Sequence, residues 1–213
     1  DFVNVFLGRL NQLVIEHKVG SGDQVGEKVT LSTQNALIEA RKNHENVKSR
    51  LIGASVRNGE QVAFLAGLDV LTIPPKAIKE FQDSGKLTSE VLSNLDKELV
   101  PGIDSSHKLA KRFPTLWELP EKFISFVDGL INENGLNEME GKDLVKICQN
   151  HEIDLFHGFS ESELQKIYDQ GKIPCLDNWP ESIALDDLMT QSALQSFSKD
   201  QNALDDRIRS FIK

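Results

Sequence analysis

The chain has 213 residues, of which 39% are hydrophobic and 27% are charged, a composition typical of a folded globular protein. Its 24 basic and 33 acidic side chains give a net charge of -9, so the mean field repels nucleic-acid phosphates and anionic lipids. We therefore expect no broad nucleic-acid surface and no membrane association, and any anion site has to be local. No apolar run approaches the roughly 20 residues that span a bilayer.

The two cysteines and the first residue bear on where the protein works. Cys148 and Cys175 follow no CxxC or other metal-ligand spacing, so we expect two reduced thiols in a cytoplasmic protein and no bound metal. Asp1 stands directly before an apolar stretch, in place of an initiator Met. We read this as a sign that the sequence is a fragment or a processed piece.

The first part of the chain alternates between short apolar runs and helical patterns. Hydrophobic spacing, Gly and Pro predict strand 2–7, helix 9–18, exposed loop 19–29, helix 32–43 capped by Ser32 and Thr33, strand 49–56, helix 57–68, strand 69–74 and helix 75–85. Strands joined through helices are parallel, which predicts an α/β fold with right-handed crossovers. Three such units leave open sheet edges, so we expect further strands before residue 1.

The rest of the chain has helical patterns only. Helices are predicted over 88–99, 119–132, 141–150, 160–171 and 187–212. Ser160 and Glu163 form an S-x-x-E capping box at the start of the fourth of these helices. Apolar residues of the last helix form a stripe that we expect to pack on the α/β part, with a surface for another protein as the alternative. The stripe consists of Leu194, Phe197, Leu204, Ile208 and Phe211.

Polar and basic residues stand where two of the predicted strands end. Ser55 and Arg57 lie at the end of strand 49–56, and Arg9 follows strand 2–7. In parallel α/β folds ligands bind at the carboxyl ends of the strands, where the next helix offers free N–H groups. The two guanidinium groups could therefore converge on one phosphate through paired, charge-assisted hydrogen bonds. A surface salt bridge is the alternative for each arginine.

Three stretches resemble the transaldolase family. "FVNVFLGRL" is similar to a family strand that ends in Phe-Val-Gly-Arg-Ile, and the positions in register are Phe6, Gly8, Arg9 and Leu10. Residues 51–81 resemble a Gly-Ala-Ser-Phe-Arg-Asn motif followed by an Ala-Gly-x-Asp-x-Leu-Thr-Ile strand, a proline and a helix. "LQSFSKDQNALDDRI" is similar to the family's C-terminal helix, through Phe197, Asp200, Gln201 and Leu204.

The resemblance implies the C-terminal part of a (β/α)8 TIM barrel with additional C-terminal helices. Residues 1–103 would hold the last β/α units, and residues 183–213 a C-terminal helix packed on the barrel. Residues 104–182 would be a helical insertion of unknown role, and we expect its aromatic residues to be core anchors. These are Phe113, Trp117, Phe123, Phe126 and Trp179.

The resemblance also implies an activity, the transfer of a dihydroxyacetone unit between sugar phosphates through a lysine Schiff base, with no cofactor. Arg9, Ser55 and Arg57 match positions that hold the substrate phosphate, and Phe6 lines the substrate pocket. Asn4 stands where the family usually has serine, which puts one hydrogen bond to substrate in doubt. The family's Schiff-base lysine, an Asp and the acid/base Glu all lie in strands that would precede residue 1. No lysine of this chain replaces the Schiff-base lysine, so we expect the chain alone to be inactive.

Two other functions stay open at this point. The first is a catalytically incomplete barrel relative that serves as a sugar-phosphate-binding or structural subunit. The second is aldol cleavage without transfer, as in the fructose-6-phosphate aldolases, although the long helical tail favours transaldolase. The expected partners are sugar-phosphate substrates, the missing N-terminal barrel segment and, as a further candidate, a second copy of the chain in a homodimer.

Overall fold

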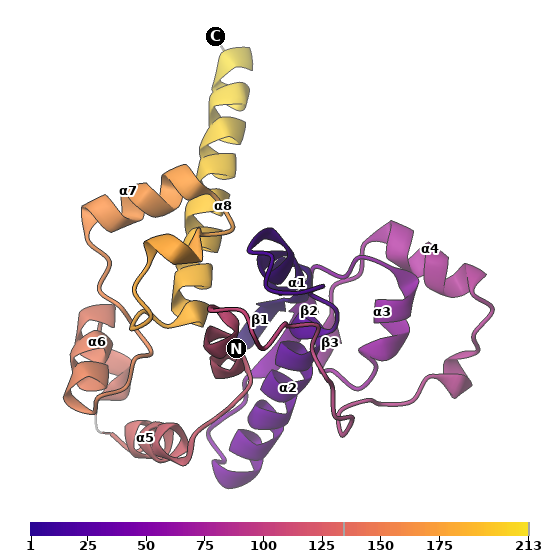
Figure 1. Cartoon of the computed structure of the whole chain (residues 1–213), viewed down its shortest axis with the longest axis horizontal. Coiled ribbons are helices and arrows are strands. Elements are labelled where there is room, and N and C mark those ends of the chain that lie inside the picture. Colours follow the sequence, from indigo (N-terminus) through magenta and orange to yellow (C-terminus); the bar gives the residue numbers. More distant parts are fainter. Residues whose placement is uncertain (134, 213) are drawn as a thin grey trace. The chain divides into compact units, whose positions relative to one another are not determined.

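A computed structural model describes residues 1–133 and 135–212 of the protein (Figure 1). These residues form two compact units, which divide between Lys111 and Arg112. The first unit contains strands and helices, and the second is helical. In the part of the chain that the structure describes, no helix is both long and apolar enough to cross a membrane.

The first unit alternates strands and helices, as the sequence predicts. Its elements in chain order are β1 (Phe2–Phe6), α1 (Leu7–Glu16), α2 (Val25–Asn43), β2 (Arg50–Ala54), α3 (Gly59–Phe64), β3 (Val70–Leu71), α4 (Pro75–Asp83) and the 3-10 helix η1 (Thr88–Glu90). Helix α3 begins after Asn58, whose side chain accepts a hydrogen bond from the backbone N–H of Gln61 at 2.9 Å. Helix α4 has Pro75 in its first turn. The mixed α/β class is therefore confirmed.

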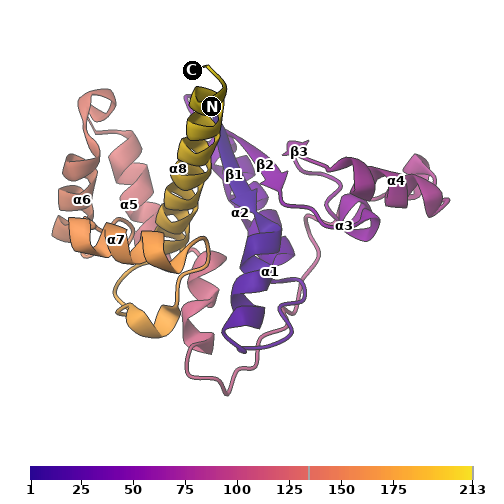
Figure 2. The ribbon, with the colours of Figure 1, turned by 90° about the horizontal axis from the view of Figure 1, so that it is seen from above.

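The three strands form one parallel sheet in the order β1-β2-β3 (Figure 2). Val5 of β1 is in register with Gly53 of β2, and such partners share a face of the sheet. A Cβ atom built on Gly53 would lie 3.5 Å from the Thr30 methyl group, so this face is covered by α2. Because side chains alternate along a strand, Asn4 and Phe6 lie on the opposite face.

The core of the first unit lies between the sheet and its helices. Its buried apolar residues are Leu7, Leu31, Val56, Leu65, Ala77 and Leu99. The described residues contain three strands and show no closed barrel. Strand β1 is an edge of the sheet, and its Phe2 and Val3 side chains are 63% and 41% exposed.

The segment predicted as an exposed loop over residues 19–29 becomes helical at Val25, and its helical part is mostly buried. Helix α2 begins at Val25, so Ser32 and Thr33 lie inside it and do not cap it. Val25 and Val29 are buried, and a Cβ atom on Gly26 would clash with the Leu7 carbonyl group. The helix starts early because this end of α2 packs closely on the start of α1, a tertiary contact that overrides the local Gly signal.

The helix predicted over residues 88–99 is also wrong, since only Thr88–Glu90 is helical. The rest has no regular secondary structure, with a turn at residues 95–96, and its carbonyl groups accept hydrogen bonds from side chains elsewhere in the unit. Lys28 Nζ donates to the Leu99 oxygen at 2.9 Å, and Asn35 Nδ2 donates to the Leu95 oxygen at 2.8 Å. These donors replace the bonds that a helix would have made. Strand β3 and helix α3 are likewise shorter than predicted.

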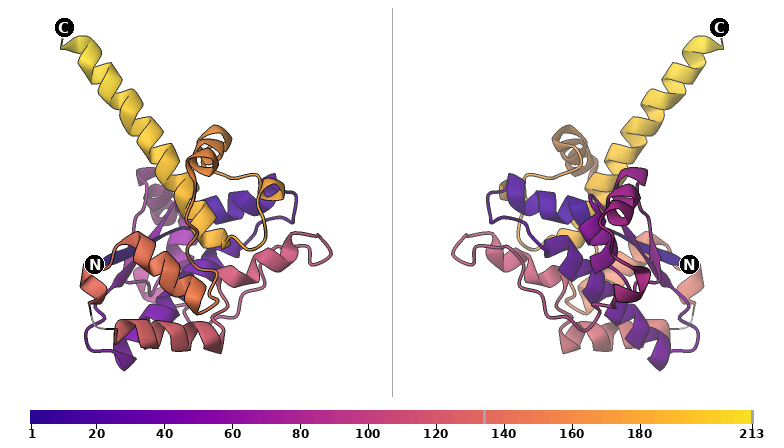
Figure 3. Two further views of the ribbon diagram at one scale, coloured as in Figure 1. Left: turned by 90° about the vertical axis from the view of Figure 1, so that its left-hand side faces the viewer. Right: turned by 90° about the vertical axis from the view of Figure 1, so that its right-hand side faces the viewer.

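The second unit follows the predicted helices closely. Its elements are the 3-10 helices η3 (Pro114–Leu116), η4 (Leu136–Glu138) and η5 (Leu176–Asn178), with α5 (Glu121–Ile131), α6 (Gly141–Asn150), α7 (Glu161–Gln170) and α8 (Leu185–Phe211). The junction turn η2 (Ala110–Arg112) precedes them. The predicted capping box of Ser160 and Glu163 is confirmed at the start of α7. Helix α8 runs without interruption (Figure 3), and the five residues of its predicted apolar stripe are exposed. The packing of that stripe on the α/β part stays a prediction.

A buried arginine holds together the loop that leads into α8. Arg112 is 6% exposed, and its guanidinium group donates to the carbonyl oxygens of Trp179 at 3.5 Å and Ile183 at 3.1 Å, among others. Burial lowers the pKa of this guanidinium below its usual value, because charge is disfavoured away from water. Phe126 and Trp179 are buried in the same unit, as expected for core aromatic residues.

Candidate functional site

Arg9, the first of the three predicted phosphate-binding residues, lies where β1 leads into α1. Helix α1 begins at Leu7, so Arg9 lies in its first turn. The Arg9 guanidinium carbon lies 5.3 Å from the centre of the Phe6 ring, and the Nη1 atom is buried. Burial lowers the pKa of Arg9 below its ordinary value. A partly desolvated cation on an aromatic ring interacts more strongly with an anion than the same cation in bulk water.

Ser55 and Arg57 occupy the turn where β2 leads to α3. Ser55 has a φ angle of +68°, a left-handed conformation that non-glycine residues seldom adopt and that concentrates at functional sites. The intervening residue, Val56, is 2% exposed and anchors the turn in the core. Arg57 is exposed, and within the described residues its guanidinium group makes no ion pair. Among residues 1–133 and 135–212, the surface salt bridge that the sequence left open for this arginine is therefore not formed.

Gly8 brings these two turns together. A Cβ atom built on Gly8 would lie 2.6 Å from Nε of Arg57, 2.6 Å from the carbonyl oxygen of Ser55 and 2.9 Å from the Ser55 hydroxyl. Only a residue without a side chain allows this approach. The Arg57 side chain therefore lies against the residue that directly precedes Arg9, at the carboxyl end of the sheet. All three predicted phosphate-binding residues are in this one region.

The two predicted pocket residues belong to the same side of the sheet. Asn4 and Phe6 alternate with Val5, which faces α2, and the contact between Arg9 and the Phe6 ring places that guanidinium beside the same face. Asn4 is exposed. None of the three strands contains a lysine, so the sheet itself offers no amine for a Schiff base.

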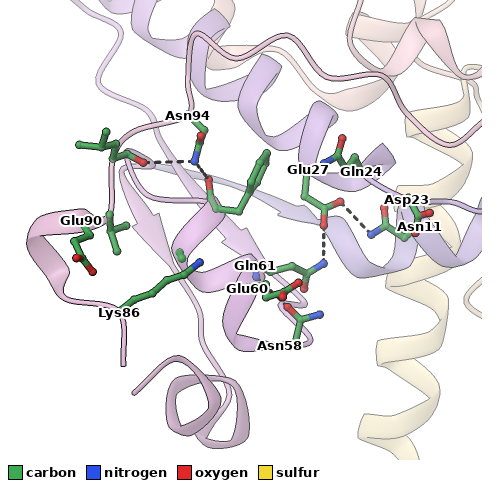
Figure 4. A pocket seen from close by; sticks show the side chains of 14 residues that line it. Asn11, Asp23, Gln24, Glu27, Asn58, Glu60, Gln61, Lys86, Glu90 and Asn94 are labelled. Carbon is green, nitrogen blue, oxygen red and sulfur yellow. Dashed lines mark hydrogen bonds between the residues drawn. The ribbon is translucent and has the colours of Figure 1, made fainter. Parts of the chain in front are cut away.

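A polar network that the sequence did not indicate links the helices next to the two turns. The Glu27 side chain is 6% exposed, and its carboxylate accepts hydrogen bonds from Asn11 Nδ2 at 3.1 Å and Gln61 Nε2 at 2.6 Å (Figure 4). Gln61 Oε1 in turn accepts the backbone N–H of Arg57 at 2.7 Å. Asn11, Glu27 and Gln61 line part of an open groove of about 760 Å³. The network connects α1, α2 and the Arg57 turn.

Comparison with known proteins adds a family to this geometry. The family model described as transaldolase/fructose-6-phosphate aldolase matches residues 1–113, more than half of the chain. The chain belongs to this family. A probable transaldolase from Dictyostelium discoideum is 27% identical over 146 residues, which are 68% of this chain and 43% of that protein, so the match spans less than half of that relative's length. No solved structure matches the chain.

The resemblance that the sequence suggested is thus confirmed at the level of the transaldolase/fructose-6-phosphate aldolase family. The matched region contains Arg9, Ser55 and Arg57, together with all three strands. The roles of these residues toward a substrate stay predictions. The buried Glu27 escaped prediction because it fell in the segment assigned to an exposed loop, where only the flanking Val25 and Val29 hinted at a buried helix face.

Proposed function

We propose that this chain is part of a transaldolase-like enzyme that transfers a dihydroxyacetone unit between sugar phosphates in the cytoplasm. Its contribution is the phosphate-binding side of the active site. The observation that carries the proposal is the close contact of Gly8 with Arg57 and Ser55. This contact brings the two arginine-bearing turns together at the carboxyl end of the sheet. Family membership of residues 1–113 supports the sugar-phosphate class of substrate.

In this proposal Arg9 and Arg57 bind the phosphate through charge-assisted hydrogen bonds, and the Ser55 hydroxyl donates a third. Asn4 and Phe6 lie on the face of the sheet that would meet the rest of the sugar. Binding the phosphate orients the distant carbonyl group, so energy from a non-reacting group accelerates the reaction at the carbonyl. The lysine that forms the Schiff base belongs to sequence outside residues 1–213.

We further propose that β1, β2 and β3 are the last strands of a (β/α)8 barrel. Two observations support this. The strands are parallel, and β1 is an edge with exposed apolar side chains, where another strand of the barrel would pair. Closure of the sheet would put Asn4 and Phe6 inside the barrel, on the face that α2 does not cover.

Calorimetric titration of the chain with inorganic phosphate and with fructose 6-phosphate tests the anion site. Arg57→Ala is expected to weaken binding by about 2 kcal/mol, the size of a hydrogen bond to a charged group. Arg50→Ala is the matched control, because Arg50 is an exposed arginine at the opposite end of β2. Equal affinity of all three proteins for phosphate would refute the site.

Borohydride reduction in the presence of fructose 6-phosphate tests where the lysine lies. We expect no covalent label on residues 1–213, because none of the three strands in the described residues carries a lysine. A reduced adduct on one of the chain's own lysines, found by peptide mass analysis, would overturn this placement.

A further inference from the structure

The most unusual polar group of the first unit is the Glu27 carboxylate, since it is nearly buried and accepts hydrogen bonds from two neutral amides. Asn11 Nδ2 donates to Oε2 at 3.1 Å, and Gln61 Nε2 donates to Oε1 at 2.6 Å (Figure 4). Asn11 Oδ1 accepts the backbone N–H of Gly26 at 2.6 Å, which secures the amide orientation of Asn11 from the other side. A buried carboxylate is costly unless it is held by such donors.

The chemistry of Glu27 determines how Gln61 is oriented. A carboxylate accepts hydrogen bonds and donates none, so Gln61 has to present its NH2 group to Glu27. Its amide oxygen then faces the other way, where it accepts the Arg57 backbone N–H at 2.7 Å. With the amide reversed, Gln61 would set its oxygen against the carboxylate and its NH2 group against the Arg57 N–H. Both contacts would be repulsive.

The network acts on both arginine-bearing turns. Asn11 lies in α1, two residues after Arg9, and Gln61 lies in α3, four residues after Arg57. Glu27 links the two amides through its two oxygens, so it fixes one turn relative to the other.

We propose that Glu27 is a positioning residue, which orients Gln61 so that the backbone of Arg57, and with it the guanidinium group, is held toward the Arg9 turn. This inference rests on the proposed phosphate site and names residues that maintain it without touching the ligand. Backbone geometry at Ser55 makes such support necessary, because a left-handed serine persists only where its surroundings enforce it.

An exchange of the two side chains tests the proposal. Glu27→Gln leaves one oxygen and one NH2 group at position 27, so the side chain can no longer accept from both Asn11 and Gln61. The Gly26 N–H holds the Asn11 amide with its NH2 group toward position 27, so we expect the new oxygen to face Asn11 and the new NH2 group to meet that of Gln61. Gln61 would relieve this contact by turning its own NH2 group toward the Arg57 N–H. The double variant Glu27→Gln with Gln61→Glu restores every pairing, because the new amide at position 27 donates to the new carboxylate at position 61, which still accepts the Arg57 N–H. The readout is hydrogen exchange of the Arg57 amide, measured by NMR on the full chain. We expect about tenfold faster exchange in Glu27→Gln, the equivalent of one lost hydrogen bond, and restoration in the double variant.

Asp69→Asn is the matched control, because it disturbs a hydrogen-bonded carboxylate at the other end of β2, where Asp69 accepts the Leu51 backbone N–H at 3.1 Å. It should leave Arg57 exchange unchanged. Unchanged exchange in Glu27→Gln, or no rescue in the double variant, overturns the proposal. If Glu27→Gln does not fold, the wild-type chain decides: an Arg57 amide that exchanges at the rate of a free peptide overturns it, and a protected amide supports it.

Titration of the same proteins with inorganic phosphate separates this inference from the proposed function. Phosphate affinity should fall about tenfold in Glu27→Gln, again the equivalent of one lost hydrogen bond, and return in the double variant. If the Arg57 amide responds as expected but the wild-type chain binds no phosphate, the positioning role of Glu27 stands and the phosphate site fails. If phosphate binds but the amide does not respond, the phosphate site stands and Glu27 has no positioning role.

Discussion

Replacing Gly8 by alanine is the sharpest test of the contact that joins the two arginine-bearing turns. The added methyl group would lie 2.6 Å from both Nε of Arg57 and the Ser55 carbonyl oxygen, whereas ordinary contacts begin at 3.4 Å. Each neighbour would therefore have to retreat by about 0.8 Å. The Arg57 side chain is exposed and has room to move, but the Ser55 carbonyl is backbone in a strained turn.

We expect Gly8→Ala to destabilise the chain by about 2 kcal/mol, within the range for overpacked sites. Inorganic phosphate should bind about tenfold more weakly, because displacing Arg57 weakens a hydrogen bond between charged groups, which is worth about 1.5 to 3 kcal/mol. Urea denaturation measures the change in the free energy of unfolding, and calorimetric titration measures the change in phosphate affinity.

Gly129→Ala is the control for this experiment. Gly129 lies inside α5, and a Cβ atom there would meet nothing within 4 Å. Alanine should therefore stabilise that helix by about 1 kcal/mol through helix propensity, without affecting phosphate. The reasoning about the turns is refuted if Gly8→Ala is as stable as the wild type and binds phosphate with the same affinity.

Three further predictions concern stability and thiol chemistry. Burial raises the pKa of Asp69, but hydrogen bonds from Gln34, the Leu51 N–H and an arginine outweigh it, so the net effect is a lowered pKa. The stabilisation from Asp69 should therefore be present above about pH 4, its unfolded pKa, and be lost as the pH falls through the folded pKa. Urea unfolding of Asp69→Asn should accordingly differ from wild type at pH 7 and converge with it at low pH; a constant difference would count against the assignment. Arg112→Met should cost about 3 kcal/mol in a thermal melt, because several buried carbonyl groups lose their donor, and an unchanged melting temperature would show that those bonds contribute little. Burial raises the pKa of the Cys148 thiol, so a thiol reagent should label the exposed Cys175 first, and the reverse order would contradict the packing of α6.

The sequence correctly predicted those helix ends that are set by residues next to them in the chain. Ser160 and Glu163 form a capping box whichever unit they belong to, and Pro75 fits only the first turn of a helix. The parallel sheet followed from the alternation of strands and helices. The alternation also placed Arg9 and Arg57 at the same end of the sheet, because the carboxyl ends of parallel strands lie together.

The errors lie where a distant contact decides the structure. Helix α2 starts at Val25 because Gly26 packs against the Leu7 carbonyl group, which no local pattern reveals. Residues 91–99 do not form the predicted helix because side chains of α2 bind the carbonyl groups of Leu95 and Leu99. The network around Glu27 escaped for the same reason, since its members are 16 and 34 residues apart along the chain.

The central claim is that the turns bearing Arg9 and Arg57 bind the phosphate of a sugar phosphate. An NMR titration of the isotope-labelled chain with fructose 6-phosphate, compared with fructose, tests it most directly. We predict that only the phosphorylated sugar shifts the backbone amides of Gly8, Arg9 and residues 55–57, and that Arg57→Ala moves the midpoint of these shifts to about thirtyfold higher concentration, the equivalent of about 2 kcal/mol. Equal shifts with both sugars, or shifts confined to other parts of the chain, would contradict the claim.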